Sequence, residues 1–449
     1  SINCYVTIVR HVANSGDLIN LDTSERCYVV GTDEIISDRS AKAKFEGDGD
    51  IGKISYSVSA TDSELTALGI SFDSDSGKLT VDNENYKKLC NQLENKGSIF
   101  LEITAKKAEV TKGLMIDNKK VKDATIYDSD EANYKVEVKF AESPQNMGYT
   151  MWDKVKDGKQ LEDYNGEIEI DKDGKEKKWF NTNVTIKPAE DYYQVAEVKD
   201  DEKEIVFNDC VTFSDQGKRD RKIYLRKKDG GITAPIKTKV KWLDSQAPHN
   251  VEIEYSKPRK SHDENEKKWR FYDDTVEVKA TFTAQDDTSG VKRFDWYYKR
   301  EDGVSESNLE NAKGTVNVKT IENEETGETY YQGTIDLKLP KEEAEKLGQE
   351  KLEQLRGNLI VKAVDNAGLS SAEYTDTGNI IVVDTISPTE KISRELLNPT
   401  ENTPQPNIVE EEGVNHYYYA GAVRFIFDIK EANFFAEDVV IKAVRSDKK

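Results

Sequence analysis

Apolar and polar residues alternate in short runs along the whole chain. The runs are about four to eight residues long, are rich in Val, Ile, Thr, Tyr and Phe, and end in clusters of Gly, Asp, Asn and Ser. Examples are residues 53–58, 135–140, 275–282 and 422–427. Because successive side chains of a strand point to opposite faces, this period of two predicts antiparallel sheets with one buried and one solvated face. The pattern predicts an all-β fold built of β-sandwiches.

Only two segments have a helical period. Residues 340–355 place Ala344, Leu347, Leu352 and Leu355 at roughly helical intervals, and residues 84–93 repeat this more weakly. Each segment comes just before a strand-like run. Both are therefore predicted to be short helical crossovers between strands.

One sequence phrase occurs twice, and it predicts a repeated module. Its first copy has a strand-like run at 223–228, a turn at 229–233 and the pair Asp244 and Pro248. Its second copy has a strand-like run at 359–364, a turn at 365–370 and the pair Asp384 and Pro388. The proline follows the aspartate by four residues in both copies (248 − 244 = 388 − 384 = 4). Recurrence at this scale is typical of an array of similar modules.

The repeated phrase also predicts the module borders. Proline lacks the backbone donor of a ladder, so Asp-x-x-x-Pro suits the end of one module and the start of the next. We expect borders near 247 and 386, and a third near 110 where the strand-like run 102–108 enters a polar stretch. The modules are then residues 1–110, 111–247, 248–386 and 387–449, named here the first to fourth modules.

The fourth module matches only the beginning of the third. A strand from Ala422, a turn at 431–433 and a strand over 438–444 match the strand from Thr275, the turn at 286–290 and the strand 291–298. We therefore expect an incomplete module with open edges. Either the chain is a fragment of a longer protein, or its last segment folds on a neighbour.

Three phrases in the third module resemble the bacterial immunoglobulin-like (Big-type) repeat modules of secreted and surface-anchored proteins. They are the turn at 284–291, the turn at 361–370 with its Asp-Asn-Ala-Gly, and the closing Val383-Asp384-Thr385 before Pro388. Residues 70–81 of the first module are similar to a cadherin-like bacterial domain. The resemblance implies tandem immunoglobulin-like β-sandwiches in an elongated array of an extracellular bacterial protein.

Composition limits the kinds of partner and the kinds of chemistry that we expect of the chain. The net charge is −21, with 65 basic and 86 acidic residues, so the surface repels phosphate backbones and nucleic acid is excluded as a partner. No apolar run approaches the roughly 20 residues that span a bilayer. The cysteines, Cys4, Cys27, Cys90 and Cys210, form no C-x-x-C pair, so zinc and redox chemistry have no support. A disulfide between Cys4 and Cys27 and buried free thiols are both open.

Catalytic patterns are absent. His11, His249, His262 and His416 fall in polar stretches without HExxH or other paired spacing, and we expect them in surface loops. There is no G-x-S-x-G, phosphate-binding loop or dinucleotide motif. The many carboxylates cannot single out a glycosidase pair. The sequence predicts a protein that is not an enzyme and needs no cofactor.

Calcium is the one metal with candidate ligands. Residues 73–77 and 171–174 are superficially similar to EF-hand loops, but the spacing of acids and glycine fits hairpin turns better. The resemblance implies that the turns and the end of the last strand meet at one pole of the third module. This would bring Asp286, Asp287, Asp365 and Asp384 together as calcium candidates, although aspartate in turns also serves the backbone.

Aromatic residues have an unremarkable expected role. Alternation places Phe294, Trp296 and Tyr298 on one face of a strand, where they suit the sandwich core, and Tyr297 on the other. Tyrosine clusters at 192–193, 330–331 and 417–419 are expected to pack, although they could also form sugar- or protein-binding surfaces.

These observations favour a monomeric, non-catalytic spacer or adhesive stalk at a bacterial cell surface or cell wall. Two alternatives stay open. The modules could be accessories of a large secreted carbohydrate-active enzyme, or one of them could bind a glycan or a host protein.

Overall fold

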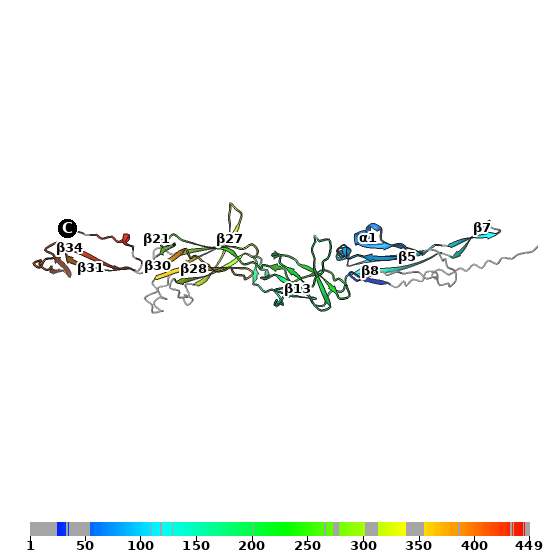
Figure 1. The fold of residues 1–449 in the computed structure, drawn as a ribbon, viewed down its shortest axis with the longest axis horizontal. Helices are drawn as coiled ribbons and strands as arrows, with labels where there is room; N and C mark the ends of the chain where they lie inside the picture. The colour runs from blue at the N-terminus through cyan, green and yellow to red at the C-terminus, as the bar shows by residue number, and fades with distance from the viewer. Residues whose placement is uncertain are drawn as a thin grey trace, which may run out of the picture. The chain divides into compact units, whose positions relative to one another are not determined.

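The protein is an all-β chain, as predicted. In the computed structural model, strands make up 53% of the chain and helices 7% (Figure 1). The structure describes residues 25–32, 35, 54–108, 110–116, 119–127, 129–200, 202–264, 266–272, 278–300, 313–337, 354–384, 387–431, 433, 435–442 and 444. Among these residues, none of the helices combines the length and apolar character needed to cross a membrane.

The chain divides into two compact units. The first contains residues 1–246 and 366–369, and the second contains residues 247–365 and 370–449. The boundary between Gln246 and Ala247 lies at the border expected near 247.

The first module is a four-stranded sheet covered on one side by helices and a hairpin (Figure 1). The sheet contains, in spatial order, β1 (Arg26–Val29), β8 (Asp130–Lys139), β5 (Ser98–Lys107) and β2 (Ile54–Val58). The cover contains α1 (Asp62–Leu68), β3 (Ile70–Asp73), β4 (Lys78–Val81), η1 (Asn83–Asn85) and α2 (Tyr86–Lys96). Along β5, Ile99, Leu101 and Ile103 are buried while Phe100 is 67% exposed, so alternation decides which face takes the cover.

The two helices differ in how visible they are in the sequence. Helix α2 confirms the segment predicted at 84–93. Helix α1 was not predicted, although it has a capping box in which the Thr61 hydroxyl accepts from Glu64 N–H and the Glu64 carboxylate accepts from Thr61 N–H. Residues 340–353 of the helix predicted at 340–355 lie outside the described residues. Its last two residues, Gln354 and Leu355, belong to a strand.

The sheet of the first module crosses the border expected near 110. Strand β8 pairs with β5 over ten residues, from Ser98 opposite Lys139 to Lys107 opposite Asp130. Between them, β6 (Val110–Ile116) and β7 (Lys119–Tyr127) form a hairpin. The first module therefore extends to the end of β8.

The second module has three small sheets around one core. The first contains β10 (Gln160–Leu161), β9 (Tyr149–Trp152), β13 (Val184–Pro188) and β15 (Val211–Phe213). The second contains β11 (Ile168–Ile170), β12 (Glu176–Phe180), β19 (Trp242–Leu243) and β16 (Gly217–Lys218). The third contains β14 (Tyr192–Glu197), β17 (Lys222–Lys227) and β18 (Ile236–Lys237). The loops at 73–77 and 171–174 are hairpin turns, as predicted.

Strand β17 is buried on both faces. Ile223 and Leu225 lie in the core of the second module, whereas Tyr224 between them lies in the core of the first. All three side chains are 0% exposed. The uninterrupted apolar run of the repeated phrase is explained by this position, because a strand covered on both sides has no solvated face.

The third module is a sandwich of two sheets. One contains β20 (His249–Tyr255), β23 (Val278–Gln285), β27 (Thr329–Leu337) and β26 (Lys319–Glu322). The other contains β21 (Lys260–Glu264), β22 (Lys267–Tyr272), β30 (Asn379–Asp384), β28 (Gln354–Asp365), β24 (Val291–Arg300) and β25 (Lys313–Asn317), with β29 (Tyr374–Thr375) beside β28. Phe294 and Tyr298 are completely buried between the sheets, and Trp296 packs partly buried against this core.

The fourth module contains two pairs of strands. Strands β31 (Thr389–Leu396) and β34 (Val423–Lys430) form one pair, and β32 (Asn407–Glu411) and β33 (Val414–Tyr418) form the other. The strand predicted at 438–444 is wrong for the described residues, since η2 (Ala436–Asp438) is followed there by irregular backbone. The corresponding β24 of the third module pairs with β25 and β28, and the described part of the fourth module has no counterpart of either. Without such partners a strand lacks its ladder.

Candidate functional site

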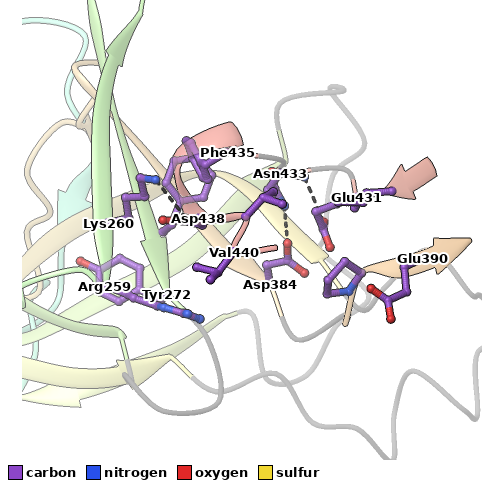
Figure 2. A pocket seen from close by; sticks show the side chains of 14 residues that line it. Arg259, Lys260, Tyr272, Asp384, Glu390, Glu431, Asn433, Phe435, Asp438 and Val440 are labelled. Carbon is purple, nitrogen blue, oxygen red and sulfur yellow. Dashed lines mark hydrogen bonds and ion pairs between the residues drawn. The ribbon is translucent and has the colours of Figure 1, made fainter. Parts of the chain in front are cut away.

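A cavity of about 390 Å³ lies in the second unit where the third and fourth modules meet (Figure 2). Strands β21, β22 and β30 contribute its wall from the third module, and β31, β34 and the turn before η2 contribute the wall from the fourth. Its volume is within the roughly 300–1,000 Å³ of small-molecule pockets.

Lys260 is the main polar contact across this junction. Its Nζ lies 2.7 Å from Glu437 Oε1 and 3.0 Å from Asp438 Oδ2. The same ammonium lies 3.9 Å from the centroid of the Phe435 ring, a distance typical of a cation–π contact. Figure 2 shows Lys260, Phe435 and Asp438 converging from the two modules.

The pKa values of this pair move in the directions expected of an ion pair. Burial acts to lower the pKa of Lys260, but the hydrogen bonds and charges of Glu437 and Asp438 outweigh it, so the pKa is raised. The hydrogen bond from Lys260 lowers the pKa of Glu437. Both groups therefore stay charged over a wide pH range.

Aromatic rings pack beside the ion pair. The Phe435 ring meets Phe271 edge to face at 4.9 Å and His262 at 6.1 Å between centroids. His262 lies in β21, and His249 and His416 lie in β20 and β33, so the expectation of loop positions is wrong for these three. His11 lies outside the described residues.

Asp384 fastens the end of the third module to the turn of the fourth. Its Oδ2 accepts a hydrogen bond from Asn433 Nδ2. Glu431 Oε1 in turn accepts from Asn433 N–H at 3.0 Å. The corresponding turn of the third module uses the same device, with Asp286 Oδ1 accepting from Thr288 N–H at 3.2 Å and from Gly290 N–H at 2.6 Å. The predicted match between the two turns extends to their hydrogen bonds.

The four predicted calcium candidates do not meet at one pole. Carboxylate oxygens of Asp286 and Asp365 lie within 4.8 Å of each other, and Asp365 is 0% exposed. Asp287 is exposed. Asp384 pairs with Gln354 at the start of β28, whereas Asp365 ends that strand. Eleven residues at about 3.3 Å each separate these ends by roughly 36 Å.

The physical reason is the direction of the strands. Strand β30 runs antiparallel to β28, so its last residue lies beside the first residue of β28. Two carboxylates supply fewer ligands than the six to eight oxygens that calcium takes, so calcium at Asp286 and Asp365 stays a prediction.

The three described cysteines, Cys27, Cys90 and Cys210, are free thiols. Cys90 is a buried free thiol, and burial raises its pKa to about 12. Cys27 is free and exposed and Cys210 is free and half-buried, while Cys4 lies outside the described residues.

The residues that line the cavity make contacts that hold the third and fourth modules together. None of the described residues that line it is a Ser, Thr, Cys or His. Its charged groups include Lys260, which forms an ion pair with Glu437, and Asp384, which accepts a hydrogen bond from Asn433. Sequence reasoning identified Asp384 and the 431–433 turn but missed Lys260, which sits in an unremarkable polar stretch.

No protein-family model matches the sequence, and no curated protein matches it.

Proposed function

We propose that this chain is a non-catalytic spacer or adhesive stalk, built of immunoglobulin-like modules and located at a bacterial cell surface or cell wall. The observation that carries the proposal is the burial of β17 between two cores. A strand shared in this way joins the first and second modules without a free linker. Such joints suit a part that holds its neighbours at fixed orientations.

The junction in the second unit supports the same role. The Lys260 contacts, the Phe435 ring and the Asp384–Asn433 hydrogen bond all join residues of two successive modules. Bending between the two modules would have to break these contacts, so they oppose it. The acidic surface, with a net charge of −21, keeps the chain soluble.

Small-angle scattering tests the proposal with a matched variant. The parent chain should scatter as an elongated particle, and Lys260→Met should add flexibility while leaving the far-ultraviolet dichroism unchanged. Met keeps the length of the side chain but removes both ion pairs. A compact particle for the parent would contradict the proposal.

A second experiment distinguishes a ligand-binding role from the spacer role. Glycan-array binding by the isolated chain would favour a ligand-binding module. A chain that binds no glycan and scatters as an extended particle supports the spacer.

A further inference from the structure

In the part of the chain that the structure describes, strand β34 is paired on one edge only. It pairs with β31 over eight residues, from Thr389 opposite Lys430 to Leu396 opposite Val423. Its counterpart in the third module, β23, pairs with β20 on one edge and with β27 on the other. Within the described residues, β34 has no second neighbour. An edge of this length offers a row of backbone donors and acceptors to another strand.

The side chains of β34 separate cleanly by face. Val423, Phe425, Phe427 and Ile429 point to one side, and Arg424, Ile426 and Asp428 point to the other. Phe425 is 57% exposed and Phe427 is 38% exposed. Monomeric proteins rarely leave neighbouring aromatic side chains on an open strand edge in solvent, so this edge is a candidate interface.

The sequence of β34 is complementary to itself about Ile426. In an antiparallel pair of two such strands with Ile426 opposite Ile426, the residues facing each other have numbers that sum to 852. Arg424 then faces Asp428, Phe425 faces Phe427, and Val423 faces Ile429. Opposite charges and aromatic pairs are the cross-strand combinations that stabilise sheets.

We propose that β34 is a self-association edge, to which a second copy of this chain adds its own β34 in antiparallel orientation. The product is a four-stranded sheet, β31-β34-β34-β31, with a two-fold axis at Ile426. The proposal replaces the monomer expected from the sequence and adds a like-with-like contact to the proposed spacer.

The register identifies a copy of this chain as the occupant. A slip of one residue would place Phe425 opposite Ile426 and turn the aromatic residues to the charged face. The chosen register makes the Arg424–Asp428 pair twice, once on each side of the axis. Within one chain Arg424 Nη1 already lies 3.2 Å from Glu395 Oε1, so the new pair would place each guanidinium between two carboxylates.

Cross-linking tests the geometry. Facing residues of an antiparallel pair have Cα atoms about 4.5–5.5 Å apart, within the range that a disulfide spans. Ile426→Cys should therefore give a disulfide-linked dimer on mild oxidation. Ser393→Cys is the matched control, because Ser393 is exposed and faces Ile426 from β31. Two Ser393 residues would be separated by three strand spacings, about 14 Å.

The parent chain provides the background for its native cysteines. A dimer band for Ile426→Cys well above both the parent and Ser393→Cys supports the proposal. Equal bands in all three overturn it.

Sedimentation with charge variants tests the register. The parent mass should rise with concentration from 50.9 kDa towards twice that value. Asp428→Arg places two arginines opposite each other and Arg424→Asp places two aspartates, so each variant alone should stay monomeric. A mixture of the two restores both opposite-charge pairs and should dimerise, which also shows that both variants are folded. A parent that stays monomeric at all concentrations, or a mixture that does, overturns the proposal.

Discussion

Gly31 and Gly230 touch where the first module meets the second. Their φ angles are +93° and +95°, a region that only glycine enters without strain. A Cβ on Gly31 would lie 2.3 Å from the carbonyl oxygen of Gly230. That oxygen belongs to the backbone, so it cannot rotate away as a side chain would.

We expect Gly31→Ala to lower the free energy of unfolding by about 2–4 kcal/mol, the sum of left-handed strain and overpacking. Urea unfolding measures this. Gly174→Ala is the control, because Gly174 has φ +77° and no atom within 4 Å of an added Cβ, so only strain of about 1 kcal/mol applies. Equal losses would show that the contact with Gly230 is loose.

The Lys260–Glu437 contact predicts how the junction responds to pH. The lowered pKa of Glu437 makes its contribution complete above its ordinary value of 4.5, and this contribution is lost as pH falls through the lowered value. The raised pKa of Lys260 makes its contribution complete below 10.5, and this is lost as pH rises through the raised value. The contact should therefore be strongest between about pH 4.5 and 10.5.

The measurement is the difference in melting temperature between the parent and Lys260→Met. This difference in melting temperature should be constant from pH 5 to pH 10 and should decrease towards pH 3. When both proteins also carry Glu437→Gln, the melting-temperature difference should decrease less between pH 5 and pH 3. A difference that does not change down to pH 3 would mean that Lys260 acts through packing on Phe435 alone.

At the residue scale, the sequence predicted Asp384 and the 431–433 turn because both belong to a repeated phrase. It could not predict Lys260 or His262, whose partners are far away in the chain: Glu437 lies 177 positions after Lys260 (437 − 260 = 177). The prediction that Asp384 and Asp365 share a pole failed because it needed the direction of β30 beside β28. Composition and turn spacing do not contain strand direction.

At the element scale, β17 links two cores by a polar contact as well as by packing. The Tyr224 hydroxyl donates to Glu94 Oε1 at 2.7 Å, which joins β17 to α2. Burial, with the hydrogen bond to Glu94, raises the pKa of Tyr224 above its usual range. The hydroxyl therefore remains protonated at neutral pH and can donate this hydrogen bond.

Tyr224→Phe removes this bond and leaves the ring in place. We expect a loss of about 1–3 kcal/mol, as for hydrogen bonds to charged groups, and faster amide exchange along α2. Tyr193→Phe on the neighbouring β14 is the control, since Tyr193 is 40% exposed. If exchange in α2 stays at the parent rate, α2 is held by its apolar contacts alone.

Helices and strands could be predicted where the period of the apolar residues in the sequence matches the pattern of buried side chains in the structure. Strand β23, in which buried residues alternate with less buried ones, contains residues 278–282 of the predicted run 275–282 and continues to Gln285, while residues 275–277 lie outside the described residues. Helix α1 has seven residues, too few for a helical period to show, and its only signal was Thr61 three residues before Glu64. The apolar run of β17 looks the same as that of a strand buried inside one sandwich. Periodicity shows that both faces are apolar, but it does not show that the two faces contact different cores.

At the scale of the whole molecule, module number and module independence are separate questions. The repeated phrase indicated where modules end, and the unit boundary after Gln246 lies at such a place. The sequence held no sign that β8 returns to the sheet of β5, or that Tyr224 belongs to the core of the preceding module. Both contacts join residues distant in the chain, and the burial of Tyr224 makes the first two modules depend on each other.

Calorimetry can determine whether that dependence is strong enough to make them one folding unit. Leu89 lies in the core of the first module and Met151 in that of the second, and both are 0% exposed. Leu89→Ala and Met151→Ala should each cost about 2–5 kcal/mol. If the shared layer couples the cores, both substitutions lower the same transition. Leu359→Ala, in the core of the third module, should lower a different one. Should Leu89→Ala and Met151→Ala move separate transitions, β17 would be a contact between independent domains, and the joint would bend under loads too small to unfold either module.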